Sequence, residues 1–138
     1  MKEINRTVRR IYSWGTIIGL ASILIIPICT YFIRESQIDT EMYRTLDNVE
    51  VHKKIEENLK WRDPKAFEAG GKIQSYTIVY ESKKINPMGG IMFSAYVNGD
   101  KTLMISFILN KDTHTGNYTL SSSASEALGK LLEENTDE

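Results

Sequence analysis

The sequence of 138 residues predicts an α+β protein with an N-terminal transmembrane helix, followed by a small domain of two helices, a four-stranded antiparallel meander and a C-terminal helix. Three observations support this fold class. Residues 11–33 contain no charged side chain, residues 38–59 repeat apolar side chains at helical spacing, and residues 73–109 show the period-two alternation of strands.

The uncharged segment 11–33 is long enough to cross a membrane. At a rise of ~1.5 Å per residue its helix spans roughly 35 Å, whereas a hydrocarbon core is ~30 Å thick. Tyr12 and Trp14 lie at its start and Tyr31 and Phe32 near its end, and such amphipathic aromatic rings prefer the membrane–water interface. We therefore predict a single-pass signal-anchor.

Three other interpretations of this segment fit less well. A cleaved signal peptide has a shorter apolar region and a small-x-small cleavage site, which residues 29–32 do not offer. Lipoprotein processing at Cys29 needs small residues where Ile26, Pro27 and Ile28 stand. A buried core helix is a further alternative, for which this segment is long.

The charges that flank the segment predict its orientation. Residues 1–10 hold four basic residues and one acidic residue, whereas residues 34–47 hold two basic and four acidic residues. Basic residues favour the cytoplasmic side of a membrane. We therefore expect a cytoplasmic N-terminus (1–10) at the cell membrane, a junction (34–40), an extracellular α+β domain (41–132) and an acidic tail (133–138).

Composition limits the partners of the extracytoplasmic domain. Four of the 17 basic and one of the 18 acidic residues precede Arg34, which leaves 13 basic and 17 acidic residues and a net charge of about −4. This balance argues against nucleic acid and against anionic lipid surfaces. Because the single cysteine, Cys29, lies in the predicted span, the domain has no disulfide and no thiol nucleophile.

Two helices, 37–46 and 48–60, are expected at the start of the domain, or alternatively one bent helix. Asp47 followed by Glu50 is a capping-box pattern, which predicts that Asp47 caps the second helix. The Asp63-Pro64 pair then favours a short turn, because Asp suits the N-cap and Pro the first helical position.

Four strands are expected next, at 73–81, 91–97, 102–109 and 117–121. A loop at 82–90 and an Asn98-Gly99 hairpin turn separate the first three, since Asn and Gly tolerate a positive φ. One face of these three strands carries the apolar and aromatic side chains: Tyr76, Ile78, Tyr80, Ile91, Phe93, Ala95, Val97, Leu103, Ile105, Phe107 and Leu109.

The last helix is expected to begin at Ser123, which forms a capping pattern with Glu126. Its apolar stripe comprises Ala124, Ala127, Leu128, Leu131 and Leu132. Helices packed on one face of an antiparallel sheet bury both kinds of apolar stripe with short connections.

No catalytic or metal-binding constellation is evident in the sequence. His52 and His114 lack ligand spacing to each other or to a carboxylate, so both are expected at the surface. Residues 121–123 are serines without a nucleophile elbow or a Ser-x-x-Lys motif. We therefore predict no catalytic residue, no metal and no cofactor, and a protein that is not an enzyme.

The loop peptide Asn86-Pro87-Met88-Gly89-Gly90 is the most distinctive part of the domain. Its glycines permit a tight reversal or a close backbone approach, and Met88 is a flexible apolar side chain suited to partner contact. Alternatively, the loop is a connection whose Met88 folds onto the core. The candidate partner-binding residues are Lys83, Lys84, Asn86, Pro87, Met88, Gly89, Gly90 and His114.

Meander geometry predicts that this loop and the turn at 113–116 lie at one end of the sheet. The strand at 91–97 leaves the loop and the strand at 102–109 returns toward it, so the Asn98-Gly99 turn lies at the opposite end. Met88 and His114 are therefore expected at the same end.

Several motifs resemble one known family. These are Asn58-Leu59-Lys60-Trp61-Arg62-Asp63-Pro64-Lys65-Ala66, Gly71-x-Ile73-Gln74-Ser75-Tyr76, Asn86-Pro87-Met88-Gly89-Gly90-Ile91 and Asn98-Gly99-Asp100. Over roughly residues 45–120 the chain resembles the family catalogued as domain of unknown function 1310. The resemblance implies a small membrane-associated or exported protein of Gram-positive bacteria and assigns no activity or catalytic residue.

The sequence thus favours a membrane-anchored protein whose extracytoplasmic domain binds a partner at the cell envelope without catalysis. The expected partners are the membrane, through residues 11–33, and another envelope protein, and no feature specifies an oligomeric state. One alternative is an envelope enzyme or auxiliary subunit, which would need Glu81 close to Asp100 or Glu50. Another is an immunity-type protein that binds a secreted toxin.

Overall fold

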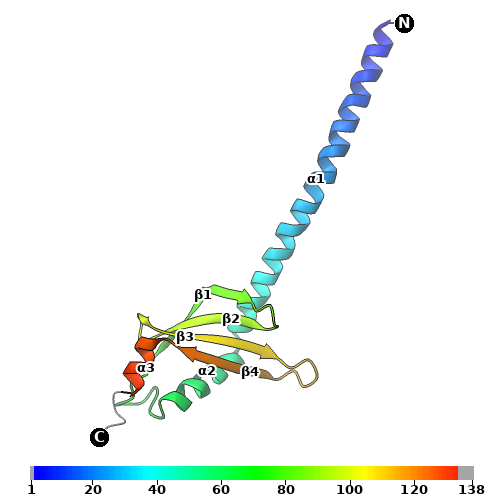
Figure 1. Ribbon diagram of the computed structural model, residues 1–138. Helices are drawn as coiled ribbons and strands as arrows, with labels where there is room; N and C mark the ends of the chain where they lie inside the picture. The colour runs from blue at the N-terminus through cyan, green and yellow to red at the C-terminus, as the bar shows by residue number, and fades with distance from the viewer. Residues whose placement is uncertain (1, 134–138) are drawn as a thin grey trace. The chain divides into compact units, whose positions relative to one another are not determined.

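A computed structural model describes residues 2–133, and for residues 2–20 and 24 it describes the backbone alone. The predicted segments 1–10 and 11–33 therefore lie wholly or partly outside the described side chains, and residues 134–138 of the predicted tail lie outside the described residues. Three helices and four strands follow in the order α1 (Lys2–Leu46), α2 (Val49–Arg62), β1 (Tyr76–Ile85), β2 (Ile91–Val97), β3 (Asp100–Lys111), β4 (Tyr118–Ala124) and α3 (Glu126–Glu133) (Figure 1).

The chain divides into two units, Met1–Thr40 and Glu41–Glu138. The second unit confirms the predicted α+β class with one four-stranded antiparallel sheet. Among the described residues, no helix combines the length and the apolar character that a membrane crossing requires. Residues 34–40, the predicted junction, are part of helix α1, in which no glycine or proline occurs between Arg34 and Leu46.

The sheet is a simple meander in which each strand pairs with the next one in the chain. Ala95 of β2 pairs with Ile78 of β1 and with Ile105 of β3. The predicted hairpin turn is confirmed, since Asn98 and Gly99 have φ values of 55° and 71°.

Strand β1 begins three residues and ends four residues later than predicted, and it contains a bulge between Val79 and Lys84. The Ser82 hydroxyl fills this irregularity. It donates to the Val79 carbonyl at 2.6 Å and accepts from the Ser94 N–H at 2.9 Å, so a side chain replaces the lost ladder bond. The connection to β2 is therefore the shorter segment 86–90.

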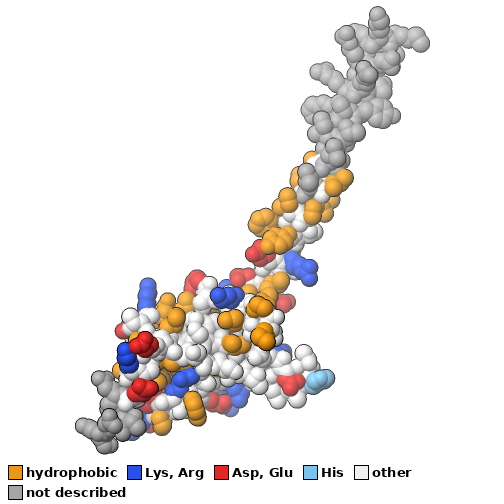
Figure 2. All heavy atoms as spheres, in the orientation of Figure 1, with side chains coloured by type: hydrophobic (Ala, Val, Ile, Leu, Met, Phe, Trp, Pro, Cys, Tyr) orange, Lys and Arg blue, Asp and Glu red, His pale blue; other side chains and the backbone are white. Residues whose placement is uncertain are grey.

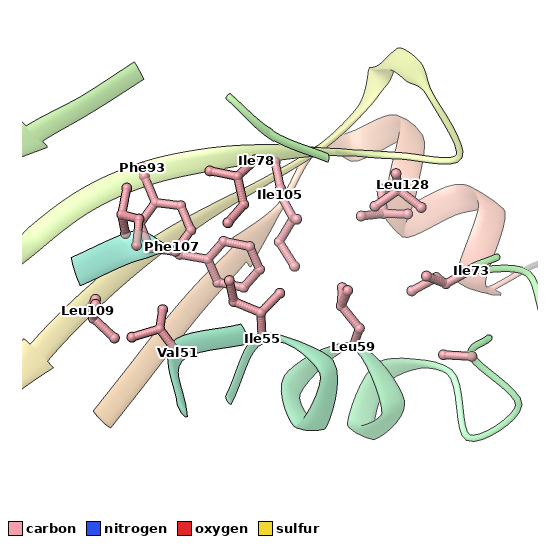
Figure 3. Packing of buried hydrophobic residues seen from close by; sticks show 14 residues of the cluster. Val51, Ile55, Leu59, Ile73, Ile78, Phe93, Ile105, Phe107, Leu109 and Leu128 are labelled. Carbon is pink, nitrogen blue, oxygen red and sulfur yellow. The ribbon is translucent and has the colours of Figure 1, made fainter. Parts of the chain in front are cut away.

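One face of the sheet, the inner face, packs against α2 and α3 (Figure 3). Val51, Ile55 and Leu59 of α2 are fully buried, and Leu128 of α3 joins them. Each such side chain contributes about 1.5–3 kcal/mol on burial. The predicted inward face is confirmed, since its side chains are buried or packed against the core: Tyr76, Ile78, Tyr80, Ile91, Phe93, Ala95, Val97, Leu103, Ile105, Phe107 and Leu109.

Both predicted helix caps are off by one or two residues. Asn48, not Asp47, caps α2, because its side chain accepts from the Glu50 N–H at 2.8 Å. Strand β4 continues to Ala124, so Ser125 rather than Ser123 caps α3 and accepts from the Leu128 N–H at 3.3 Å.

Asp63 organises the segment between α2 and β1. Its carboxylate accepts the N–H groups of Lys65, Lys72 and Ile73 at 3.1, 2.7 and 2.8 Å. Only 9 % of the residue is exposed. Because three backbone donors satisfy the buried carboxylate, Asp63 terminates α2 and holds the chain in place rather than starting a new helix.

Candidate functional site

The face of the sheet opposite α2 and α3, the outer face, carries short polar and apolar side chains. Its cross-strand rows follow from the register, and the central row aligns Val79, Ser94, Ser106 and Ser123. The Ser94 and Ser106 hydroxyl oxygens lie 3.3 Å apart. The residues that the register places on this face include Thr77, Val79, Lys84, Met92, Ser94, Tyr96, Met104, Ser106, Ile108, Asn110, Thr119, Ser121 and Ser123.

A shallow pocket of about 420 Å³ lies on this face. Serine hydroxyls, the Lys84 ammonium and two apolar side chains, Met92 and Ile108, supply its chemistry. Serine hydroxyls both donate and accept, so the pocket suits a polar or anionic group beside an apolar one. Its residues are Ser82, Lys84, Met92, Phe93, Ser94, Ser106, Phe107, Ile108, Ser121, Ser122 and Ser123.

The residues that line the pocket bring several serine hydroxyls near one basic side chain, that of Lys84, and include no His, Asp or Glu. The described residues likewise form no cluster of His, Cys, Asp and Glu able to hold a metal ion. What the pocket offers is binding by hydrogen bonds, one cation and apolar contact.

The predicted placement of the loops is confirmed. Ile91 pairs with Ile85 and with Leu109, and Lys111 pairs with Tyr118, so the segments 86–90 and 112–117 lie at one end of the sheet. Lys84 connects this end to the pocket, because it lines the pocket and directly precedes Ile85.

The conformation of the 86–90 turn directs Met88 outward. Asn86 closes the turn with three bonds: its side chain accepts from the Met88 N–H, its carbonyl accepts from the Gly89 N–H, and its N–H donates to the Gly90 carbonyl. Met88 is 95 % exposed. The alternative in which Met88 folds onto the core is therefore wrong.

Gly90 is where another part of the backbone approaches closely. A Cβ at this position would collide with the Leu109 carbonyl oxygen and the Asn110 side chain, and φ is +85°. Gly89, with φ +101°, has open space around it. Gly90 thus allows β3 to approach the turn, whereas Gly89 only permits the reversal.

His114 lies exposed in the neighbouring turn. The Asp112 carboxylate accepts the His114 and Thr115 N–H groups at 2.7 and 3.0 Å. These bonds, that of Thr115 first, lower the pKa of Asp112 below its ordinary value. The structure thus places His114 and Met88 on two turns at one sheet end, Lys84 at the pocket, and the half-buried Lys83 in the bulge of β1.

The prediction that His52 lies at the surface is wrong. His52 is half-buried, and its Nδ1 lies 2.7 Å from the Tyr76 hydroxyl. Burial, and then the charges of Glu56 and Tyr80, raise the pKa of Tyr76 to about 12. This pair joins α2 to β1.

Sequence reasoning considered the serines at 121–123 only as nucleophiles, and it did not predict that Ser123 lies in one row with Ser94 and Ser106. The signal was the polar half of the strand alternation, since Met104, Ser106 and Ile108 point opposite to Ile105 and Phe107. Only the inward half of that pattern was interpreted.

The fold and the site define a small α+β module with one sheet face packed by helices and a pocket on the other. The chain belongs to the family described as protein of unknown function (DUF1310), whose family model matches residues 14–132. Comparison with curated proteins gave no match, and comparison with solved structures gave none either.

Proposed function

We propose that this protein is a single-pass membrane protein, anchored through residues 11–33, whose extracytoplasmic α+β unit binds a partner at the cell envelope through its outer face, without catalysis. The observation that carries the binding role is the outer face itself. Its pocket is lined by eleven residues of which only Lys84 is charged, in a unit otherwise rich in surface charge.

The described part of α1 supports the anchor. Figure 2 shows apolar side chains on the visible face of this part of the helix. Large apolar side chains at seven positions are 55–67 % exposed, and at 3.6 residues per turn these positions cover every side of the helix: Ile23, Ile25, Ile26, Ile28, Tyr31, Phe32 and Ile33. A helix that is apolar all round is stable when protein or lipid surrounds it, and it is unfavourable in water. The basic residues of segment 1–10 support a cytoplasmic N-terminus.

The pocket and the loop end support one continuous binding surface. Lys84 lines the pocket, and the exposed Pro87 and Met88 follow within four residues. A partner that covers both would bury apolar side chains and meet hydroxyl groups and one cation. Such a mixture is typical of protein interfaces, in which polar and apolar areas are of similar size.

Site-specific photocrosslinking in membranes tests this proposal. A photoreactive residue at Ser106, inside the pocket, is compared with one at Lys60, which is exposed on α2. We expect a discrete crosslinked species at Ser106 that is absent at Lys60 and absent after Ser94→Arg fills the pocket. Equal labelling at the two positions, or none at Ser106, would contradict a partner on the outer face.

A further inference from the structure

The outward edge of β4 can be identified from its hydrogen bonds. The strand order in the sheet, β1-β2-β3-β4, makes β1 and β4 the edge strands. The Ser125 N–H donates to the Met104 carbonyl, and the Asn117 carbonyl accepts from the Asp112 N–H. The register between these points is unbroken. In β4 the odd-numbered residues therefore form backbone hydrogen bonds with β3, and the even-numbered residues direct their backbone N–H and C=O groups away from the sheet.

Part of this edge is already covered by α2. The Arg62 guanidinium donates to the Ser122 carbonyl at 3.1 Å and to the Ser122 hydroxyl at 2.8 Å. The Ser122 hydroxyl donates to the Asn58 side chain at 2.6 Å. Within the described chain, no such contact reaches the outward backbone groups of Tyr118 and Leu120.

The two edges of the sheet differ in how they resist pairing. Strand β1 carries the bulge between Val79 and Lys84 and the charged residues Glu81, Lys83 and Lys84, all of which disfavour a further strand. Strand β4 has no charge, no proline and no register shift from Tyr118 to Ala124. Edge β4 is therefore suited to accept a strand.

A groove follows the open part of the β4 edge. It has a volume of about 360 Å³ and lies between Lys54, Glu57 and Asn58 of α2 and residues 118–120 of β4. Lys54 and Glu57 form an ion pair of 3.1 Å at its wall. The groove leaves room for an extended chain beside Tyr118 and Leu120.

We propose that β4 pairs antiparallel with β4 of a second copy of this chain, so that the two sheets become continuous. An uncharged strand meets its own copy without like-charge repulsion. If the pairing is centred on Leu120, in the open part of the edge, Thr119 of each copy lies opposite Ser121 of the other and forms a favourable hydroxyl pair.

Pairing of this kind changes the outer face as well. Ser121 and Ser123 line the outer-face pocket and belong to β4. In the dimer these serines lie next to the boundary between the two β4 strands. The outer-face pockets of the two copies are then neighbours on one continuous sheet surface. The pairing itself does not depend on the envelope role proposed above.

Disulfide crosslinking of the full-length protein in membranes tests the pairing. In a Cys29→Ser background, cysteines at Thr119 and Ser121 are compared with cysteines at Thr77 and Glu81, which are exposed on β1. Residues paired across antiparallel strands lie within disulfide reach. We expect a covalent dimer in high yield for the β4 pair alone. Equal yields on both strands, no dimer, or a β4 adduct of another mass would overturn the proposal.

A charge substitution gives a second readout. Thr119→Lys places a cation at the boundary between the two β4 strands, and the exposed Thr77→Lys is its matched control on β1. In detergent, sedimentation equilibrium should show at least a tenfold weaker dimer for Thr119→Lys and no change for Thr77→Lys, with far-UV circular dichroism unchanged in both. The same dimer affinity in the two variants would contradict pairing through β4.

Discussion

Single residues hold the segment between α2 and β1 in place. The Asp63 carboxylate bonds three backbone N–H groups, and the Asn98 side chain accepts the Gln74 N–H at 2.7 Å and donates to the Lys72 carbonyl at 2.7 Å. Gly71 lets the chain pass against the Lys65 carbonyl. Five of these residues, Asp63, Lys65, Gly71, Gln74 and Asn98, belong to three of the four motifs that carry the family resemblance, so these three motifs hold the fold in place.

Removal of the Asp63 carboxylate should destabilise the second unit. Asp63→Ala leaves three N–H groups without their acceptor, at a cost of roughly 3 kcal/mol, because buried donors that lose a charged acceptor are expensive. Urea unfolding measures this loss. Asp63→Asn, which keeps one carbonyl oxygen, should lose less. A free energy of unfolding equal to that of the wild type in Asp63→Ala would show that the carboxylate does not hold this segment.

The two glycines of the 86–90 turn should respond differently to alanine. Gly89→Ala costs about 1–2 kcal/mol, because only its positive φ opposes a side chain. Gly90→Ala should cost roughly 2 kcal/mol more, because its Cβ also meets the Leu109 carbonyl. Thermal unfolding of the two variants checks the order. Equal losses would mean that the approach of β3 to Gly90 is not tight.

Tyr76 should make stability depend on pH in the alkaline range. Its pKa rises from about 10 to about 12 in the folded chain, so the folded state favours the neutral phenol. The stabilisation is complete below pH 10 and is lost as the pH rises toward 12. Tyrosinate absorbance should show this late titration, and Tyr76→Phe should abolish it. A Tyr76 that titrates with the exposed tyrosines would contradict its burial beside His52.

At the scale of elements, periodic side-chain patterns predicted the strands and helices, whereas features that depend on a single side chain, the bulge and the helix caps, were not predicted correctly. Periodicity located β2 at its observed bounds and the apolar face of α2, because a buried stripe must recur at every turn or every second residue. The bulge of β1 was missed, since it depends on a bond from the Ser82 hydroxyl that no repeat signals. Caps were misplaced for a similar reason, because adjacent residues of similar type compete for one position.

The N-cap of helix α3 can be tested by substitution of Ser125 and Ser123. Ser125 accepts from the Leu128 N–H, accepts from the Met104 N–H at 3.2 Å and donates to the Thr102 carbonyl at 2.9 Å. Ser125→Ala should therefore cost about 1–2 kcal/mol in chemical denaturation. Ser123→Ala, at the position that the capping pattern favours, should cost less than about 0.5 kcal/mol, as exposed substitutions do. Reversed magnitudes would restore Ser123 as the cap.

For the whole molecule, sequence reasoning predicted the α+β class and the common sheet end of the 86–90 and 112–117 turns. It did not find the outer face, because serines separated by many residues become a row only through strand register. Ser94, Ser106 and Ser123 are such a row. Partner binding at Lys84, Met88 and His114 stays a prediction, and the pocket adds the serines to it.

Protease treatment of intact cells tests most directly whether the α+β unit stands outside the membrane, anchored by residues 11–33. The chain carries a tag after Glu138, and membranes are separated before the tag is detected. We predict that the tag sediments with membranes, resists carbonate extraction, and is lost when protease is added to whole cells. A tag that survives in whole cells and is cleaved only after lysis, or one that carbonate releases, would contradict this account.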